Sequence, residues 1–428
     1  MPYQSPISPG LSWYEATAGE RPEYPKLDGD ASADVAVVGG GFTGLSAAAH
    51  LAKLGADVVL IEAHRFGDGA SGRNGGQLGT GQRGEPGDYE KAFGFERAKA
   101  LFDLAEEAKA HLLDFARAHG IDIDYTPGQL SVAHKKRYVA DYREYADIMR
   151  ERYGYPHLSF MDAAETAGRL GSTRYHGGLR DSGTGHIHPL KLAVGTARVA
   201  AEAGAKLHEQ TPATALSSDG GKVRIATPTG TVTADRCLLA TDAHVGGLEK
   251  QSASHIMPIG SFIAATEPLP EDSSVLLGRE SVDDSRFVVR YFRRMRTGEL
   301  LFGGREIYSP GTPGDLQAAL RRQIEEIYPT LRDVPITHAW GGWVGITVPR
   351  RIFVREVMPR VISAGGYSGH GVMLSNFMGK LYAEAVAGNR DRLHLFKELK
   401  VPAFPGGRRF RAPLLFLALS WYALRDRI

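Results

Sequence analysis

The stretch Asp34–Glu62 constrains the fold of this chain more than any other part of the sequence. It begins with an apolar run, Val35–Val38, which leads into three glycines at G-x-G-x-x-G spacing, Gly39, Gly41 and Gly44. An alanine- and leucine-rich stretch, Leu45–Leu54, follows, and a second apolar run, Val58–Ile61, ends at Glu62. This order predicts strand, glycine turn, helix, strand and acid, the first βαβ unit of a dinucleotide-binding fold.

Each part of this unit has a physical role in holding a dinucleotide. Gly39 permits the tight turn, Gly41 lets a pyrophosphate approach the backbone, and Gly44 lets the helix pack closely on the strand. The helix N-terminus supplies free N–H groups and the positive end of a dipole. Glu62 can accept hydrogen bonds from both ribose hydroxyls, and its charge disfavours the 2′-phosphate of NADP. A βαβ unit that packs but binds nothing is the alternative, and the agreement of all these features argues against it.

Composition narrows the classes of protein. The 428 residues suffice for two domains, and 43% hydrophobic and 23% charged residues are ordinary for a globular chain. A formal charge of +2 gives no electrostatic case for nucleic acid. The single cysteine, Cys237, precludes an internal disulfide and fits a cytoplasmic location. The first residues, MPYQSPISPG, do not resemble a signal peptide, no window predicts a transmembrane helix, and no metal is expected.

Many of the 52 glycines fall in three clusters. Cluster one is the turn Gly39–Gly44, and cluster two is Gly67–Gly84, which follows the second predicted strand. Cluster two contains SGRNGGQ, in which successive glycines and Asn74 can form a nest of backbone N–H groups beside the charge of Arg73. Such a nest suits a diphosphate or the pyrimidine oxygens of a flavin. A flexible surface loop is the alternative reading.

Cluster three, Gly365–Gly371, repeats the strand, glycine turn and helix near the end of the chain. A predicted strand, Arg360–Ala364, precedes it, and a predicted helix, Val372–Ala387, follows it. A second glycine-rich helix N-terminus is unnecessary for NAD alone. It suits a flavin, because reduction places negative charge around N1 and C2=O, where a helix dipole stabilises it. An ordinary strand-to-helix turn is the alternative, but it does not explain four glycines in seven residues.

The remaining pattern predicts a mixed α/β chain. Residues before Asp30 are rich in proline and aromatics and predict an extended arm on the surface. Helices are expected over Phe95–His119, Lys135–Tyr153, His188–Ala203 and Ala318–Tyr328. Strands are expected over Tyr125–Val132, Lys206–Gln210, Thr214–Leu216, Val223–Ala226, Val232–Ala234, Arg236–Ala240, Phe287–Phe292 and Leu300–Phe302.

Seven segments carry a resemblance to a known family: GGGFTGLSAAAHLAKLGADVVLIEA, ASGRNGGQ, TPATAL, LLATDAHV, LLFGGRE, WGGWVGITVPR and GYSGHGVMLSNFMGKLYAEAVAG. They resemble the D-amino-acid-oxidase-like FAD-dependent oxidoreductase superfamily, and within it the gamma-glutamylputrescine oxidase type. The resemblance implies a Rossmann-like FAD-binding domain with an inserted α+β substrate domain built on an antiparallel sheet. The expected FAD-binding domain comprises residues 30–100, 180–249 and 355–395, the substrate domain 101–179 and 250–354, the N-terminal arm 1–29 and the C-terminal tail 396–428.

The resemblance also assigns residues to FAD. Cluster one and the acid meet the adenosine diphosphate, cluster two follows the diphosphate and the flavin, a strand near Ala213 meets adenine, and cluster three faces the flavin pyrimidine. The implied cofactor-binding residues are Gly39, Gly41, Phe42, Thr43, Gly44, Glu62, Ala63, Ser71, Gly72, Arg73, Asn74, Gly75, Gly76, Gln77, Leu78, Ala213, Thr241, Gly366, Gly369, His370, Gly371 and Val372. One departure is Ala240-Thr241-Asp242, where the family commonly has ATG, and this puts the local backbone geometry in doubt. Noncovalent FAD is expected, while His64 and His370 leave covalent attachment open.

Substrate contacts are expected from Tyr291, Arg293, Trp343 and Tyr367, with Arg305 and Trp340 as further candidates. Aromatic side chains can hold an amine by cation–π contact, and an arginine can pair with a substrate carboxylate. The alternative is that these are core and surface residues of a sheet. The sequence identifies no catalytic base.

The resemblance implies oxidation of an amine, including gamma-glutamylated, secondary or primary amines, to an imine that hydrolyses to an aldehyde. Oxygen is expected to reoxidise the flavin and give hydrogen peroxide, with a dehydrogenase as the open alternative. A sarcosine- or glycine-type amino-acid oxidase and a non-catalytic FAD-binding subunit are the rival hypotheses. The apolar segment Ala412–Leu424 is too short to span a bilayer, so it predicts a docked helix, with weak membrane association as the alternative. The sequence leaves the oligomeric state open.

Overall fold

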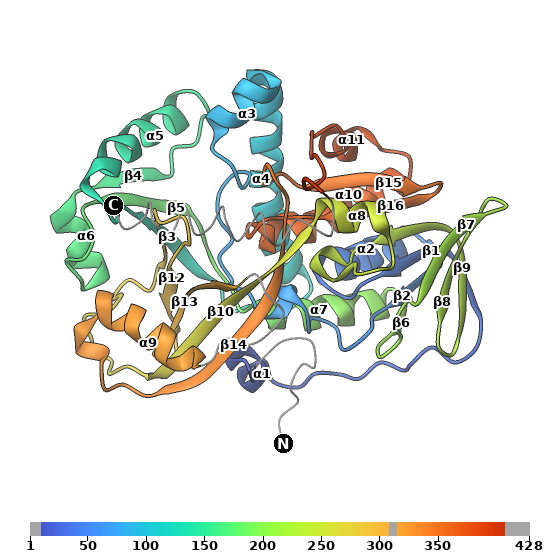
Figure 1. The fold of residues 1–428 in the computed structure, drawn as a ribbon, viewed down its shortest axis with the longest axis horizontal. Coiled ribbons are helices and arrows are strands. Elements are labelled where there is room, and N and C mark those ends of the chain that lie inside the picture. Colours follow the sequence, from blue (N-terminus) through green and yellow to red (C-terminus); the bar gives the residue numbers. More distant parts are fainter. Residues whose placement is uncertain (1–9, 308–314, 407–428) are drawn as a thin grey trace.

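The computed structural model describes residues 10–307 and 315–406, with the side chains of 305–307 excepted. Two eight-stranded sheets divide these residues between them (Figure 1). The predicted C-terminal helix Ala412–Leu424 and the side chain of Arg305 lie outside the described residues. None of the described helices is both long enough and apolar enough to cross a membrane.

The first sheet has the order β15-β16-β9-β1-β2-β6, with β8 on β9 and β7 on β8. The pairs β1–β2, β1–β9, β9–β16 and β2–β6 are parallel, as in a doubly wound nucleotide-binding fold. The strands are β1 (Ala31–Val38), β2 (Val58–Ile61), β6 (Lys206–His208), β7 (Ala215–Asp219), β8 (Lys222–Thr227), β9 (Gly230–Leu239), β15 (Phe353–Met358) and β16 (Val361–Gly365).

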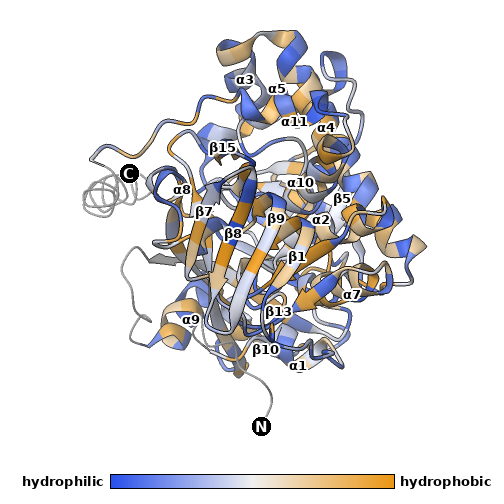
Figure 2. Cartoon of the chain, turned by 90° about the vertical axis from the view of Figure 1, so that its right-hand side faces the viewer, coloured by the Kyte–Doolittle hydropathy of each residue, from blue (hydrophilic) through white to orange (hydrophobic). Residues whose placement is uncertain are grey.

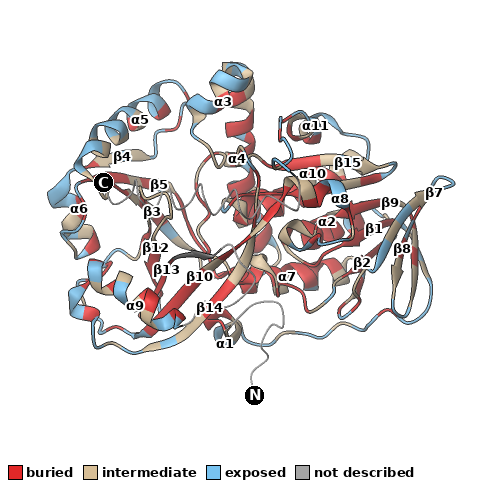
Figure 3. Ribbon diagram, in the orientation of Figure 1, coloured by how far each residue is buried: buried red, intermediate tan, exposed pale blue. Residues whose placement is uncertain are grey.

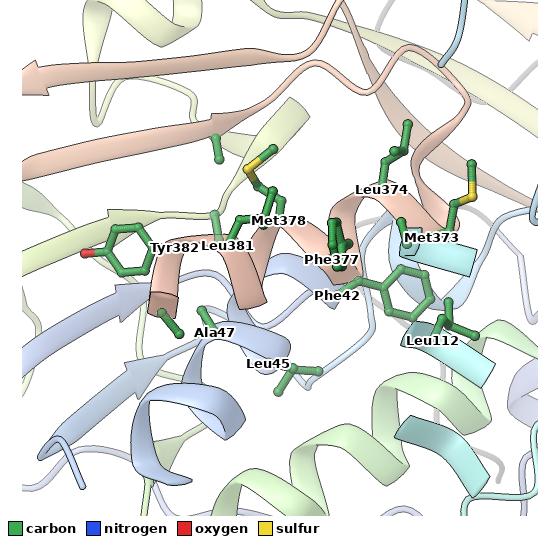
Figure 4. Packing of buried hydrophobic residues seen from close by; sticks show 14 of the residues in the cluster. Phe42, Leu45, Ala47, Leu112, Met373, Leu374, Phe377, Met378, Leu381 and Tyr382 are labelled. Atoms are coloured by element: carbon green, nitrogen blue, oxygen red, sulfur yellow. The ribbon is translucent and has the colours of Figure 1, made fainter. Parts of the chain in front are cut away.

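Helices cover one face of this sheet, and the β7–β8–β9 ribbon folds against the other (Figures 1 and 2). The helices are α2 (Phe42–Lys53), α4 (Phe95–Ala118), α7 (Pro189–Glu202) and α10 (Gly371–Val386). Figure 4 shows apolar side chains of α2, α4 and α10 meeting between the helices. Gly379 permits the close approach of α10 to α2, since a Cβ there would lie 2.5 Å from the Ala47 nitrogen. Both helices are therefore held rigidly with their N-termini side by side.

The second sheet has the order β14-β10-β13-β12-β11-β3-β5-β4, in which only β11 and β3 are parallel among the described neighbours. One face packs against α9 through apolar side chains. The strands are β3 (Thr126–Val132), β4 (Leu158–Met161), β5 (Gly178–His186), β10 (Met257–Pro268), β11 (Ser281–Asp284), β12 (Tyr291–Arg294), β13 (Glu299–Ile307) and β14 (Ile336–Ile346).

The outer helices are more exposed than those at the centre (Figure 3). They are α3 (Pro86–Phe93), α5 (Val139–Glu151), α6 (Ala163–Leu170), α8 (Lys250–His255), α9 (Leu316–Ile327) and α11 (Asp391–Lys397). The α/β fold class predicted from the sequence is confirmed, while several boundaries differ.

Two of the predicted domain boundaries divide elements from the layers to which they belong. The boundary at residue 180 cuts β5, which runs to His186 and pairs with β3 and β4 of the second sheet. The boundary at residue 101 assigns most of α4 to the substrate domain, yet Leu101, Leu112 and other apolar residues of α4 pack into the core of the first sheet. Strand pairing places β5 with the second sheet, and packing places α4 with the first.

Two predicted strand patterns also differ. The strands expected over Val232–Ala234 and Arg236–Ala240 form the single strand β9, because β1 pairs with it along its length. The strand expected over Phe287–Phe292 begins only at Tyr291. The residues before it form a turn in which Asp284 Oδ1 accepts hydrogen bonds from the nitrogens of Arg286 and Arg290.

The arm before Asp30 is not wholly extended or superficial, in contrast to the prediction. It contains a short helix, α1 (Trp13–Thr17), with a capping box in which Ser12 Oγ accepts from the Glu15 nitrogen and Glu15 accepts from the Ser12 nitrogen. Trp13 and Tyr14 are buried against Trp340 and neighbouring residues of the second sheet. The arm is therefore part of the core between the two sheets.

Candidate flavin site

Cluster one joins β1 to α2 in a turn that only glycine can form. Gly39 has a φ of +111°, and a Cβ on Gly44 would lie 1.9 Å from the Gly39 oxygen. Gly41 is the N-cap of α2 and offers no side-chain cap, although Ser71 Oγ accepts a hydrogen bond from the Phe42 nitrogen at 2.9 Å. The N-terminus of α2 is thus built from backbone N–H groups with little side-chain cover, which suits a pyrophosphate.

Glu62 lies directly beside this turn at the end of β2. Its Oε2 accepts a hydrogen bond from the Gly40 nitrogen at 2.6 Å, and its Oε1 accepts one from the His64 nitrogen at 2.9 Å. Burial raises the pKa of this carboxyl, while the two N–H donors oppose the rise. The carboxylate is held in place by one bond to each oxygen and keeps lone pairs for two ribose hydroxyls. The backbone nitrogen of Thr211 donates to the backbone oxygen of Glu62, so the segment that leads to Ala213 runs beside the end of β2.

Cluster two crosses from the first sheet to the second. Asn74 shapes the turn, since its Nδ2 donates to the oxygens of Ala70 and Ser71 and its Oδ1 accepts from the Gly76 nitrogen. Gln77 Nε2 donates to the Val282 oxygen of β11 at 2.9 Å, and the Leu78 nitrogen donates to the Gly185 oxygen of β5. Cluster two is therefore a fixed bridge rather than a flexible loop.

Arg73 differs from the sequence interpretation. Its guanidinium is turned away from the nest and lies in the core, where Nε donates to the Gly341 oxygen at 2.7 Å and Nη1 pairs with Glu15 Oε1 at 3.0 Å. The Arg73 and Glu15 side chains are 2% and 4% exposed. The charge predicted for a diphosphate instead joins cluster two to α1 and β14.

Cluster three begins α10 beside cluster one. Gly366 and Gly369 have φ values of +71° and +86°. The Tyr367 hydroxyl lies 2.7 Å from Thr43 Oγ1 and links the two helix N-termini. His370 covers Gly79, where a Cβ would lie 2.2 Å from the ring, and its Nε2 lies 3.1 Å from the Gly81 oxygen. Burial lowers the pKa of His370 to about 4, so the ring is neutral at pH 7.

Asp242 replaces the glycine of the family sequence, and the structure shows how it is accommodated. It has a φ of +45°, a conformation that glycine adopts readily and aspartate tolerates. Its Oδ1 accepts from the Gly366 nitrogen at 2.6 Å, and its Oδ2 accepts from the Gly345 nitrogen at 3.1 Å. Burial raises the pKa of this carboxyl. Asp242 thus ties the segment at Thr241, beside Gly39, to β14 and to cluster three.

Four residues were expected to meet the substrate, and two of them are not open to one. Arg293 is 1% exposed, with its guanidinium donating to His186 Nδ1, the Ile187 oxygen and the Tyr14 hydroxyl. Tyr367 is buried between α2 and α10, as described above. Both therefore act within the fold, and neither supports the role predicted for it. Tyr291 and Trp343 are partly exposed on β12 and β14.

Several site residues were not predicted. Tyr14 accepts a hydrogen bond from Arg293, and Glu15 pairs with Arg73. The S-x-x-E capping pattern that begins at Ser12 is the sequence signal for the short helix that carries both residues. Lys109 of α4 lies under the end of cluster two, where its Nζ donates to Thr80 Oγ1 at 2.9 Å and pairs with Glu106. No sequence pattern identified this contact, because its partners come from separate elements.

The residues present fit FAD. A glycine cradle at the N-terminus of α2 and a fixed carboxylate suit the adenosine diphosphate, and a second glycine turn at α10 lies beside the first. Cluster two continues from the cradle to the second sheet, the path that a dinucleotide with a large second base requires. A flavin mononucleotide has no adenosine to meet Glu62 and cluster one.

Comparison with known proteins agrees with this geometry. Residues 34–385 match the family model described as DAO, FAD dependent oxidoreductase. The chain is 62% identical over 427 residues to the probable oxidoreductase OrdL of Rhizobium meliloti (strain 1021), covering 100% of both chains. It is 35% identical over 420 residues to the gamma-glutamylputrescine oxidoreductase of Escherichia coli (strain K12), covering 97% of this chain and 98% of the relative.

A solved structure shows the same fold. The glycine oxidase from Bacillus cereus ATCC 14579 superposes with a TM-score of 0.73 at 21% identity, over 87% of this chain and 100% of that one. The family predicted from the seven segments is confirmed. The chain belongs to the DAO family of FAD-dependent oxidoreductases, and its cofactor is FAD.

Proposed function

We propose that this oxidoreductase oxidises an amine to an imine, which water hydrolyses to an aldehyde. The observation that carries the proposal is the meeting of the three glycine clusters at a polar face of the second sheet, where Tyr291 lies against Gly75. The similarity to a gamma-glutamylputrescine oxidoreductase over nearly the whole chain supports an amine as substrate. A gamma-glutamylated or other primary or secondary amine is the substrate class that we propose.

Bound FAD supplies a two-electron acceptor for the C–H bond next to the amine nitrogen. The chain's own residues hold that acceptor and the amine in place. Clusters one and two and Glu62 would hold the adenosine diphosphate, and Gly366, Gly369, His370, Gly371 and Val372 would face the flavin pyrimidine. The N-terminus of α10 stabilises negative charge that develops there. The aromatic ring of Tyr291 shields the reacting carbon from water and attracts a cation.

The overall reaction balances with oxygen as acceptor. A primary amine loses two electrons and two protons to give an imine, water converts the imine to an aldehyde and ammonia, and oxygen takes the two electrons and two protons to give hydrogen peroxide. A secondary amine releases a shorter amine in place of ammonia. The proposal places the enzyme in the cytoplasm, in keeping with its single buried cysteine, Cys237.

An amine panel mixed anaerobically with the purified enzyme tests the proposal. At least one amine is expected to bleach the visible flavin band, and peroxide is expected when air is admitted. A flavin that glycine or sarcosine bleaches and amines do not would favour the amino-acid oxidase alternative. Bleaching that persists in air would indicate a dehydrogenase.

The proposal also includes noncovalent FAD. Of the two histidines that left covalent attachment open, His64 and His370, the second lies against Gly79, and its Nε2 lies 3.1 Å from the Gly81 oxygen. Acid precipitation is therefore expected to release the flavin into the supernatant as FAD. A flavin that stays with the precipitated polypeptide would contradict noncovalent binding.

A further inference from the structure

The second sheet has two chemically different faces. On β3, β11 and β12, one face carries the apolar residues Leu130, Val132, Val282 and Phe292, which belong to the core beneath α9. The alternate positions carry polar side chains, Gln129, Ser131, Asp283, Tyr291 and Arg293. Because successive side chains of a strand point to opposite faces, these polar residues share the face turned away from α9.

Three of these positions, together with Gly303 of β13, form one row across the strands. Ser131 pairs directly with Asp283, Asp283 with Tyr291, and Tyr291 with Gly303. Directly opposed residues lie on the same face, so the four share a row. The row reaches cluster two, because a Cβ on Gly75 would lie 2.9 Å from the Tyr291 ring. Gln77 of cluster two also contacts β11, because its Nε2 donates a hydrogen bond to the backbone oxygen of Val282, the residue before Asp283.

Asp283 is the carboxylate of this row, and its partners are neutral. Its Oδ1 accepts hydrogen bonds from Gln129 Nε2 at 2.6 Å and from Ser131 Oγ at 3.0 Å. In the part of the chain that the structure describes, no lysine or arginine forms an ion pair with it. The neighbouring Asp284 points to the other face, where it pairs with Arg286 and accepts from the Tyr175 hydroxyl. Asp283 is half-buried, and the row on which it lies leads through Tyr291 to Gly75 of cluster two.

A half-buried carboxylate that forms no direct ion pair costs free energy, which a bound cation would offset. Burial raises the pKa of Asp283 to about 6, while the charge of Arg83 opposes the rise. Arg83 itself is fixed by a bond from its Nε to the Ser368 oxygen of cluster three. The carboxylate, the Tyr291 ring and the cradle thus lie along one wall.

We propose that Asp283 binds the positively charged nitrogen of the amine substrate, with the face of Tyr291 beside it. The inference rests on the proposed function and deepens it, because it assigns the substrate class to a side chain. A carboxylate on this wall attracts an ammonium group and repels the carboxylate of a small amino acid. It therefore selects amines over substrates of the glycine type.

The test is an equilibrium titration with tert-butylamine, which has no hydrogen on the carbon bearing nitrogen and therefore binds without being oxidised. At pH 8 the amine is charged and Asp283 is ionised. The perturbation of the visible flavin spectrum gives the dissociation constant. Asp283→Asn keeps the acceptor for Gln129 and Ser131 but removes the charge, and we expect it to weaken binding about tenfold or more.

Asp219→Asn, at an exposed position of β7, is the matched control, since it removes the same charge from the other sheet, and its dissociation constant is expected to stay within about threefold of the wild type. FAD content and melting temperature of both variants are expected to match the wild type. Unchanged affinity in Asp283→Asn would overturn the inference. If affinity is unchanged in Asp283→Asn but amines bleach the wild-type flavin, the proposed function holds and only the role of Asp283 is overturned. A wild type that tert-butylamine does not perturb and no amine bleaches would overturn both.

Discussion

The two sheets contribute to the flavin site in different ways. The first sheet offers backbone: glycine turns, helix N-termini and one carboxylate that is itself held by backbone N–H groups. The second sheet offers side chains from several strands, which the arm and cluster two hold in place. A site made of backbone groups depends on the spacing of glycines, which the sequence shows directly. A side-chain site depends on strand pairing, and its residues are scattered along the chain.

The largest expected effect comes from the ion pair between Glu15 of the N-terminal arm and Arg73 of cluster two. Glu15→Gln leaves the Arg73 guanidinium buried without its acid, and breaking a buried pair costs roughly 3–5 kcal/mol. We expect a lower free energy of unfolding, measured by urea denaturation of the holoenzyme, and weaker FAD retention. Glu20→Gln, an exposed acid of the same arm, is the control and is expected to change stability by less than about 0.5 kcal/mol. Equal stability of the two variants would mean that the arm does not hold cluster two.

The outcome of the sequence predictions follows the same division. Cluster one, its helix and Glu62 are placed in one unit as predicted, because local spacing determines a βαβ turn. Arg73 and Arg293 were recognised as important charges but assigned wrong directions, since their partners, Glu15 and Tyr14, lie far away in sequence. The position of β5 was missed for the same reason, because pairing with β3 and β4 leaves no local pattern.

The next effect tests the backbone region alone. Glu62→Ala removes the carboxylate that we propose accepts charge-assisted hydrogen bonds from the ribose. Such bonds are worth roughly 1.5–3 kcal/mol, so FAD affinity is expected to fall about ten- to hundredfold. Titration of apoprotein with FAD measures the change. Glu23→Ala, an exposed acid of the arm, is the control. Wild-type affinity in Glu62→Ala would remove this carboxylate from the nucleotide site.

A smaller effect tests the side-chain region through pH. Asp283 has a pKa raised to about 6, so it is ionised above that pH and protonated below it. The tert-butylammonium ion stays charged throughout this range. Its dissociation constant is therefore expected to rise about tenfold for each pH unit below about 6, and to be flat above. Bound cation lowers the pKa of Asp283, which moves the midpoint down in the complex. The profile is expected to flatten in Asp283→Asn, and an equal slope in the variant would assign the titration to another group.

The central claim is that the adenosine end and the flavin end of the cofactor are held by separate turns, and potentiometric titration of Gly371→Val tests it most directly. A side chain there meets Tyr367 Cβ at 3.0 Å, so a branched residue displaces the turn that we propose faces the flavin pyrimidine. We expect a lower reduction potential with FAD affinity near that of the wild type, whereas Gly168→Val on exposed α6 changes neither. An unchanged potential in a Gly371→Val protein that still binds FAD would show that cluster three does not lie at the flavin ring.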